Sequence, residues 1–304
     1  MTMPNFLIIG TAKAGTTSLH RYLSQHPEIY MSPNKEPRFF AFDGENLDPQ
    51  HPIHHKTITN LEAYQALFDA VSHEKAIGET SPAYLVEPKA PVRIQHYIPE
   101  AKMIAVLRNP AERAYSHFLH LIKHNYEPCH DFGIALQKED DLRIGPWSPR
   151  HDYLLFGFYY KNLKRYFEMF DRGQFKIFLF EDLKSDPTAL LQKIFRFLEV
   201  DDTFIPDVSL HHSVSGIPKS RALHNLLSGY NPVRSFMKPF LRPFISKDLQ
   251  ERLEYWLKIR NLQKPQLSQE IRNFLIDIYR EDILNLQELI QVDLSEWIEG
   301  KVIE

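Results

Sequence analysis

The stretch "NFLIIGTAKAGTTSLHRYL" (5–23) contains a short apolar run, a loop with one lysine between two glycines, and a helix-like segment that begins with hydroxyl residues. This order is typical of the first strand, loop and helix of a parallel α/β sheet. It is close to the phosphate-binding pattern GxxxxGK[ST], but Gly15 is followed by Thr16 and Thr17, and the lysine is Lys13, inside the loop. The pattern therefore predicts an anion site, while its altered order disfavours a Walker-type nucleotide hydrolase.

The alternation of apolar runs and helix-like segments continues along the chain. Three further runs are predicted strands: "KAIGET" (75–80), "KMIAVL" (102–107) and "FKIFLFED" (175–182). Helices are predicted at 15–26, 109–124, about 150–170, 187–199, 247–262 and 267–290. We expect one domain over 1–304 with a P-loop-like three-layer α/β fold: a central parallel sheet, helices on both faces and a helical C-terminal third.

Composition restricts the possible partners. The 36 basic and 39 acidic side chains leave a formal charge of −3, which gives no reason to expect nucleic acid or an anionic membrane surface, so any anion site must be local. Cys129 is the single cysteine, and an intramolecular disulfide is therefore impossible. The N-terminus has no basic leader, and no apolar run approaches the ~20 residues of a membrane span. These features predict a soluble cytoplasmic protein and leave its oligomeric state open.

The predicted position of the loop at 11–15 suits an anion. A loop that leaves the carboxyl end of a parallel strand and opens a helix presents free backbone N–H groups and the positive end of the helix dipole. Lys13 can reach over a bound phosphate, and the hydroxyls of Thr16 and Thr17 can donate to its oxygens. An ordinary strand–turn–helix junction capped by threonine remains an alternative for this stretch alone.

Three motifs, in their order along the chain, resemble the sulfotransferases that use 3′-phosphoadenosine 5′-phosphosulfate, above all the branch with bacterial enzymes and heparan sulfate sulfotransferase domains. The resemblance covers roughly residues 5–225 and the closing "DLSEWI" (293–298). It implies that the first loop holds the 5′-phosphosulfate, and that "LRNPAERAYSH" (107–117) and "PKSRAL" (218–223) bind the 3′-phosphate. The donor site that it implies consists of Lys13, Ala14, Gly15, Thr16, Thr17, Ser18, Arg108, Ser116, Lys219, Ser220 and Arg221. The implied co-substrate is 3′-phosphoadenosine 5′-phosphosulfate, with no metal.

The chemistry of this donor agrees with separated motifs. A nucleotide with phosphates at both its 5′ and 3′ positions needs two anion sites, one at a helix N-terminus and one built from arginine and hydroxyl donors. Each motif alone has a simpler explanation: Arg108 can be a structural ion-pair partner of Glu112, and Lys219 and Arg221 can be solvated surface charges. A nucleotide-dependent phosphotransferase and a nucleotide-binding protein without turnover remain alternatives.

The stretch "NKEPRFFAF" (34–42) follows the first helix and a short extended segment, "EIYMS" (28–32). The resemblance implies that Glu36 is the general base, a role that the reaction needs because a hydroxyl is a poor nucleophile until a positioned group takes its proton. The adjacent proline and phenylalanines are expected to make the site partly dry and to raise the basicity of Glu36. Lys13, with Lys35 as the second candidate, is expected to stabilise the departing oxygen.

Two alternatives to this base stay open. Glu36 can be held in a surface ion pair with Lys35 or Arg38, and His20 or His117 can take the proton in its place. His117 also shares a helix face with two further histidines, but no His-Glu-x-x-His pattern or cysteine cluster accompanies them, so no metal is expected.

The sequence indicates less about the acceptor. Heparan-modifying relatives resemble "EKTPAY" where this chain has "GETSPAY" (78–84), so Thr80 stands where a lysine could meet a sulfated or carboxylated sugar. We therefore expect a hydroxyl on a smaller carbohydrate, a lipid or a metabolite, with an amine as an open alternative. Tyr159 or Tyr160, in an aromatic stretch whose simplest interpretation is a core helix, can contact the nucleotide or the acceptor.

Overall fold

The computed structural model describes residues 2–48, 56–124, 126–137, 152–209, 216–220, 256–257, 260–263 and 265–299. The chain divides into two compact units. The first consists of Met1–Ala114, Asp152–Ser213 and Gln269–Glu304, and the second of Tyr115–His151 and Val214–Ser268. The single domain over 1–304 stays a prediction.

The first unit is built on a five-stranded parallel sheet with the strand order β2-β3-β1-β4-β5. The strands are β1 (Phe6–Gly10), β2 (Ile29–Met31), β3 (Ala76–Thr80), β4 (Lys102–Leu107) and β5 (Phe175–Leu179). All four predicted strands are therefore confirmed, and the short extended segment after the first helix is β2. The fourth predicted strand is shorter than expected: the carboxylate of Asp182 accepts a hydrogen bond from the Leu179 N–H at 3.4 Å, where helix α8 (Phe180–Ser185) begins.

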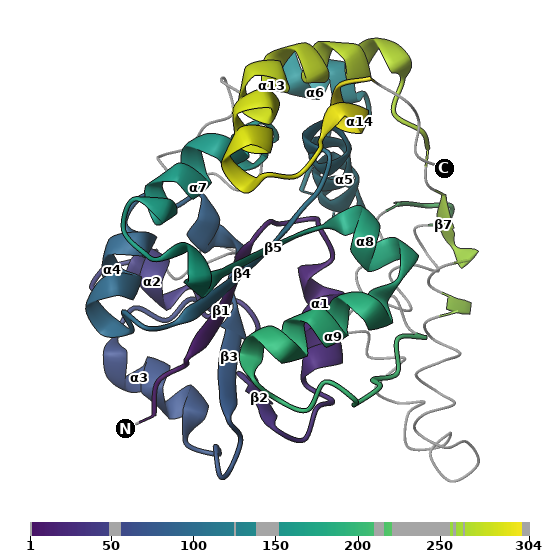
Figure 1. The fold of residues 1–304 in the computed structure, drawn as a ribbon. Helices are drawn as coiled ribbons and strands as arrows, with labels where there is room; N and C mark the ends of the chain where they lie inside the picture. Colours follow the sequence, from purple (N-terminus) through teal and green to yellow (C-terminus); the bar gives the residue numbers. More distant parts are fainter. Residues whose placement is uncertain are drawn as a thin grey trace, which may run out of the picture. The chain divides into compact units, whose positions relative to one another are not determined.

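Helices cover both faces of this sheet, as predicted. Figure 1 shows α1 (Thr16–Leu23) and α9 (Pro187–Leu198) against one face, and α4 (Ala90–Tyr97) and α7 (Tyr159–Phe167) against the other. Alternate residues of β1 point to opposite faces, so Phe6 and Ile8 join one buried cluster with side chains of α1 and α9. Burial of these apolar side chains stabilises the packing of α1 and α9 on the sheet, and this packing holds the loop between β1 and α1 in place.

The remaining elements of the first unit are short, except for one long helix. Among the described residues they are α2 (Phe39–Phe42), α3 (Leu61–Gln65), α13 (Gln269–Ile290), α14 (Ser295–Ile298) and the 3₁₀ turns at Ala66–Phe68, Pro82–Leu85, Leu155–Gly157 and Arg172–Gln174. The helices predicted at 187–199 and 267–290 are confirmed as α9 and α13. The helix predicted at about 150–170 is instead a 3₁₀ turn followed by α7, because Phe158 is non-helical and Asp282 of α13 accepts a hydrogen bond from the Tyr160 N–H at 3.0 Å.

Helix α5 (Pro110–Lys123) begins in the first unit and continues into the second. Its start agrees with the sequence, since the Asn109 side chain accepts hydrogen bonds from the Ala111 and Glu112 N–H groups at 3.0 and 3.3 Å. The second unit also contains α6 (Phe132–Gln137) and an antiparallel pair, β6 (Ile217–Pro218) and β7 (Leu262–Gln263). Most of the helix predicted at 247–262 lies outside the described residues.

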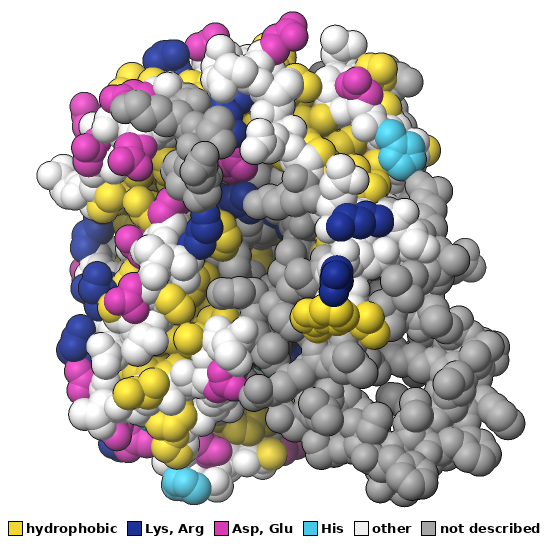
Figure 2. Space-filling view, turned by 90° about the vertical axis from the view of Figure 1, so that its right-hand side faces the viewer, with side chains coloured by type: hydrophobic (Ala, Val, Ile, Leu, Met, Phe, Trp, Pro, Cys, Tyr) yellow, Lys and Arg dark blue, Asp and Glu magenta, His cyan; other side chains and the backbone are white. Residues whose placement is uncertain are grey.

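The surface agrees with the near-neutral composition. On the face that Figure 2 presents, basic and acidic side chains are interspersed over the described residues rather than gathered by sign. Within that part of the chain, none of the helices has the length and apolar character needed to cross a membrane.

Candidate functional site

The loop after β1 has the backbone geometry of an anion cradle. The Thr11 N–H donates to the Val106 carbonyl of β4 at 2.8 Å, which fixes the start of the loop between the two central strands. Gly15 has a φ of 82°, and a β-carbon there would lie 2.5 Å from the Leu183 side chain, so glycine is required. Gly15 is the N-cap of α1 and, as a glycine, supplies no side-chain cap to this helix. The first N–H groups of α1 lie at the end of the helix that adjoins the loop.

The other predicted residues of this loop line the same turn. Lys13 has a positive φ of 73°, and Ala14 is buried. Thr16 and Ser18 are buried in the first turn of α1, while Thr17 is partly exposed. The arrangement can bind one anionic group at the helix N-terminus.

Arg108, directly after β4, connects the second motif to this loop. Its guanidinium donates a hydrogen bond from Nη1 to the Lys13 carbonyl at 3.1 Å and lies over the Phe180 ring, 4.8 Å from the centroid. Arg108 is only 9% exposed, and burial lowers its pKa from the ordinary value despite the nearby carboxylates of Glu112 and Glu181. The Tyr159 hydroxyl donates to the Arg108 carbonyl at 2.8 Å. Of the two candidate tyrosines, Tyr159 thus contacts the backbone of Arg108 and helps to fix its position.

The ion pair predicted for Arg108 is present, but Glu112 has a second partner. Arg108 Nη2 lies 3.6 Å from Glu112 Oε2, while Arg272 of α13 makes a shorter contact with Glu112 Oε1. Sequence reasoning did not identify Arg272. Its only signal is a charged residue near the start of an amphipathic helix, and its partner lies 160 residues away.

The remaining residues assigned to the donor lie in the second unit or outside the described residues. Ser116 is buried on α5. Lys219 and Ser220 are exposed, and their backbone is held by Asn261, which accepts from both N–H groups at 2.7 and 3.0 Å. Arg221 lies outside the described residues. The structure brings Arg108 of the second motif against the Lys13 carbonyl of the first, and the donor-binding roles of all three motifs stay predictions.

Glu36 is clamped between two cations. Its Oε1 lies 2.5 Å from Lys35 Nζ and its Oε2 lies 2.5 Å from Arg38 Nη2, while its N–H donates to the Thr80 carbonyl at 2.9 Å. Burial by itself raises the pKa of this carboxyl, but the charges and hydrogen bonds of Lys35 and Arg38 outweigh burial and lower the pKa to about 2. The ion-pair alternative is thus confirmed, and the expected rise in the basicity of Glu36 is wrong. The side chain keeps 30% exposure, so it can still meet a substrate.

His20 contacts Thr80, the residue whose carbonyl accepts from the Glu36 N–H. Its Nδ1 is 3.0 Å from the Thr80 hydroxyl, and the ring is 7% exposed. Burial, followed by the charges of Lys35 and Arg21, lowers its pKa to about 4 despite the opposing effect of Glu36. His20 is therefore neutral at pH 7. His117, the other alternative base, is buried on α5 in the second unit.

A second carboxyl near this site was not predicted. Glu79 of β3 is fully buried and accepts hydrogen bonds from the Tyr84 and Tyr64 hydroxyls at 2.5 and 3.3 Å. Its Oε2 has no hydrogen-bond partner among the described residues. Burial raises its pKa to about 7, with a further contribution from the charge of Glu36. The sequence signal was an acidic residue inside an otherwise buried parallel strand.

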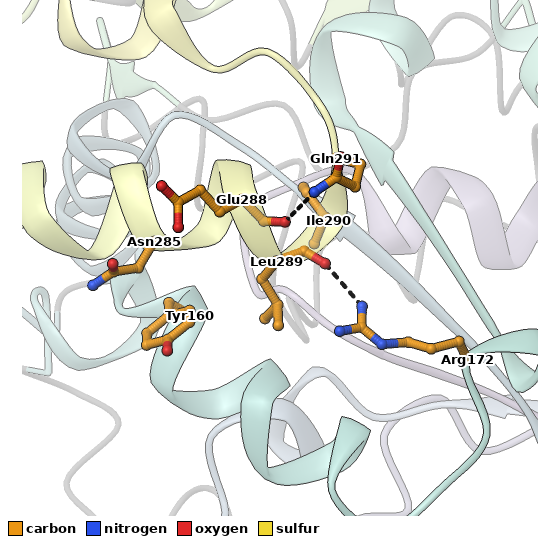
Figure 3. A pocket seen from close by; sticks show the side chains of 7 residues that line it. All are labelled: Tyr160, Arg172, Asn285, Glu288, Leu289, Ile290 and Gln291. Carbon is orange, nitrogen blue, oxygen red and sulfur yellow. Dashed lines mark hydrogen bonds between the residues drawn. The ribbon is translucent and has the colours of Figure 1, made fainter.

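Tyr160, the other candidate tyrosine, lies in a different setting. It lines a surface pocket between α7 and the end of α13, with Arg172, Asn285 and the last residues of α13 around it (Figure 3). The polar groups there bind one another: Arg172 donates to the Leu289 carbonyl at 2.8 Å, and Gln291 donates to the Glu288 carbonyl at 2.7 Å. We assign no ligand to this pocket.

Metal ligands do not gather in the part of the chain that is described. No group of three or more histidine, cysteine, aspartate or glutamate side chains is placed to hold a metal ion there. Directly after α5, the His124 ring donates to the His120 carbonyl at 2.8 Å, which gives that ring a structural role.

Comparison with known proteins decides the family. The family model described as "Sulfotransferase domain" matches residues 3–281. The chain belongs to the sulfotransferase family. This confirms the resemblance and the predicted enzyme class, a sulfotransferase, and the sulfotransferase fold agrees with the parallel sheet flanked by helices.

Relatives of this sulfotransferase are found among bacterial and animal proteins. A solved structure, "Crystal Structure of Sulfotransferase from Alicyclobacillus acidocaldarius", is 31% identical, with a TM-score of 0.75 over 98% of this chain and 99% of that one. The bifunctional heparan sulfate N-deacetylase/N-sulfotransferase 4 of Mus musculus is 27% identical over 300 residues, which are 95% of this chain and 30% of the relative. The N-deacetylase/N-sulfotransferase 2 of Bos taurus is 31% identical over 209 residues, 65% of this chain and 22% of the relative. The chain spans less than a third of these curated relatives.

Proposed function

We propose that this sulfotransferase moves a sulfuryl group from 3′-phosphoadenosine 5′-phosphosulfate to a hydroxyl of a carbohydrate acceptor. The observation that carries the proposal is the hydrogen bond from the Arg108 guanidinium to the Lys13 carbonyl. It links the loop suited to a 5′-phosphosulfate with the arginine suited to a 3′-phosphate. A donor with two separated anionic groups matches this pair of sites better than a donor with one phosphate chain.

The donor would use residues of three motifs. The phosphosulfate would lie against the first turn of α1, which carries Thr16, Thr17 and Ser18. As the resemblance implies, the residues proposed for the 3′-phosphate are Arg108, Ser116 and the segment from Lys219 to Arg221.

The reaction needs one bond to form and one to break. The acceptor oxygen attacks sulfur while the bond from sulfur to the bridging phosphate oxygen breaks, and the hydroxyl proton passes to the Glu36 carboxylate. By analogy with phosphoryl transfer, we infer an in-line path with a loose transition state. Negative charge grows on the departing phosphate oxygen, where the Lys13 ammonium would stabilise it without a metal.

The low pKa of Glu36 fits this role only if its environment changes when the donor binds. Lys35 now contacts Glu36 at 2.5 Å, and a phosphosulfate would offer it a second anion. If Lys35 turned toward the donor, Glu36 would lose one of its two cationic partners and its pKa would rise. Lys35 would then bind the negatively charged donor and, by leaving Glu36, raise the pKa of that carboxylate. Glu36 could therefore accept a proton once the donor is bound, despite its low pKa before.

Glu36→Gln tests the mechanism. The substitution keeps the size and the hydrogen bonds but removes the proton acceptor, so single-turnover sulfation at saturating donor should slow by about 10²–10⁴-fold. Affinity for adenosine 3′,5′-bisphosphate, measured by calorimetry, should change little. A variant rate close to wild type would exclude Glu36 and favour His20, whose neutral ring lies 3.0 Å from Thr80.

An amine is the second candidate acceptor, since the two animal relatives are named as N-sulfotransferases. A matched pair of acceptors separates the two: a hexosamine oligosaccharide with free amines and its fully N-acetylated form. Sulfation of both supports a hydroxyl, whereas sulfation of the free-amine form alone supports an amine.

The phosphotransferase alternative predicts a different ligand preference. A sulfotransferase should bind adenosine 3′,5′-bisphosphate tightly without magnesium and ATP weakly. The reverse preference in calorimetry would refute the proposed donor. A cytoplasmic location stays a prediction.

A further inference from the structure

Glu112 lies between two buried arginines and does not contact them equally. Arg272 of α13 makes the shorter contact, to Oε1, and Arg108 is 3.6 Å away, beside Oε2. The arginine side chains are 6% and 10% exposed, whereas Glu112 is 26% exposed. One carboxylate thus serves two guanidinium groups, and the one assigned to the nucleotide has the looser contact.

The shorter contact of Glu112 with Arg272 matters because carboxylates lie near Arg108. The charges of Glu112 and Glu181 act on Arg108, and Arg113 is a cation that acts on it as well. A phosphate of charge near −2 that approaches Arg108 must overcome repulsion from each ionised carboxylate. A carboxylate that is already bound to another arginine repels the phosphate less and competes less for the guanidinium donors.

Arg272 is held firmly enough to act in this way. It projects from α13, which is anchored to the rest of the unit where the Tyr279 hydroxyl donates to the Leu154 carbonyl at 2.9 Å and Asp282 accepts from the start of α7. Arg272 is buried, and its Nε has no hydrogen-bond partner among the described residues. The contact with Glu112 therefore compensates a guanidinium that is otherwise costly to bury.

We propose that Arg272 is a positioning residue that holds Glu112 away from Arg108 and thereby sets the preference of this enzyme for a 3′-phosphorylated nucleotide. The inference rests on the proposed function, because it gives Arg108 the 3′-phosphate as its ligand. Without Arg272, Glu112 would turn fully to Arg108, neutralise it and repel the phosphate. A purely structural ion pair would instead affect all ligands alike.

The test measures affinity for adenosine 3′,5′-bisphosphate and for adenosine 5′-phosphate by calorimetry, in wild type and variants of the full chain. Arg272→Gln should weaken binding of the bisphosphate about 10-fold and leave that of the 5′-phosphate unchanged. Adding Glu112→Gln should restore the wild-type ratio to within about threefold, because the competing carboxylate is gone. Arg280→Gln is the matched control, since Arg280 lies on the same helix in an exposed pair with Asp277.

Each outcome bears on one claim. A wild-type protein without preference for the bisphosphate would refute the proposed donor itself. Given that preference, an Arg272→Gln variant that loses affinity for both nucleotides equally, or a double variant as weak as the single one, would overturn the positioning role. If Arg272→Gln does not fold, Arg272→Lys and Glu112→Gln replace it: both should keep or strengthen the preference, and a loss in Glu112→Gln refutes the inference.

Discussion

Replacing Glu79 with glutamine should change how stability depends on pH. Glu79 is fully buried in β3, and burial raises its pKa from 4.5 to about 7, against the hydrogen bonds from Tyr84, Ser81 and Tyr64. The difference of about 2.5 pKa units, at about 1.4 kcal/mol per unit, corresponds to about 3 kcal/mol of folding free energy. Glutamine has nearly the same volume and can still accept the hydrogen bond from Tyr84.

Proton binding by Glu79 decides whether the free energy of unfolding rises or falls with pH. The folded state holds the Glu79 proton more tightly than the unfolded state, so the folded state binds more protons between pH 4.5 and about 7. The free energy of unfolding therefore falls as pH rises through this window, and the loss is complete above the folded pKa. Glu79→Gln lacks this contribution, so the variant should gain about 3 kcal/mol relative to wild type between pH 4.5 and 8.

Urea unfolding of both proteins at several pH values from 5 to 8 measures most of this change. The control is Glu62→Gln on the neighbouring helix α3, where the side chain is exposed and the same substitution should give a nearly constant difference. A Glu79→Gln difference that stays constant within about 0.5 kcal/mol over this range would show that Glu79 does not bind a proton on folding.

Three further substitutions test the assigned roles. Arg108→Ala should weaken binding of adenosine 3′,5′-bisphosphate by about 10- to 100-fold, as expected for a lost charge-assisted contact of about 1.5–3 kcal/mol, with little effect on adenosine 5′-phosphate; an unchanged ratio in calorimetry contradicts the assignment. Lys13→Ala should lower both donor affinity and the single-turnover rate, because its ammonium would contact the donor before and during transfer; a loss of affinity alone would remove its role at the departing oxygen. Arg38→Gln removes one of the two cations that lower the pKa of Glu36 to about 2, so the acid limb of the pH–rate profile should move to higher pH, and an unmoved limb argues against Glu36 as the base.

Much of the first unit could be predicted from local sequence. The strands β1, β3 and β4 are short apolar runs bounded by loop residues, and their burial on both faces matches that pattern. The start of α5 was equally local, because Asn109 and Pro110 supply a favoured N-cap and first turn. The place of the anion loop followed from the same order of strand, loop and helix.

The errors arose where contacts between residues far apart in the sequence, or unusual backbone angles, decide the outcome. The start of α7 depends on Asp282, which lies more than 100 residues away along the chain. The basicity of Glu36 was misjudged because the apolar neighbours were visible in the sequence, whereas the simultaneous approach of Lys35 and Arg38 needs the positive φ of 66° at Glu36 and of 55° at Arg38. The spacing of apolar residues along the sequence does not indicate which residues adopt a positive φ.

The strand order explains how one sheet edge could serve both donor and acceptor. The chain leaves β1 toward β2 and β3 on one side, then crosses to β4 and β5 on the other, so β1 lies at the point where the order reverses. Ligands of open parallel sheets bind at the carboxyl ends of the strands near such a point.

The loop with Lys13 emerges at this reversal, with the residues proposed for the two substrates on opposite sides of it. Arg108 follows β4 and is covered by Phe180 after β5, whereas Glu36 is bonded to Thr80 at the end of β3. Under the proposed function, the phosphosulfate would lie at the loop with Lys13, the nucleotide would extend from it toward Arg108 after β4, and the attacking hydroxyl would enter from the side of β3. Nucleophile and leaving oxygen would then stand on opposite sides of sulfur, which is the geometry that in-line transfer requires.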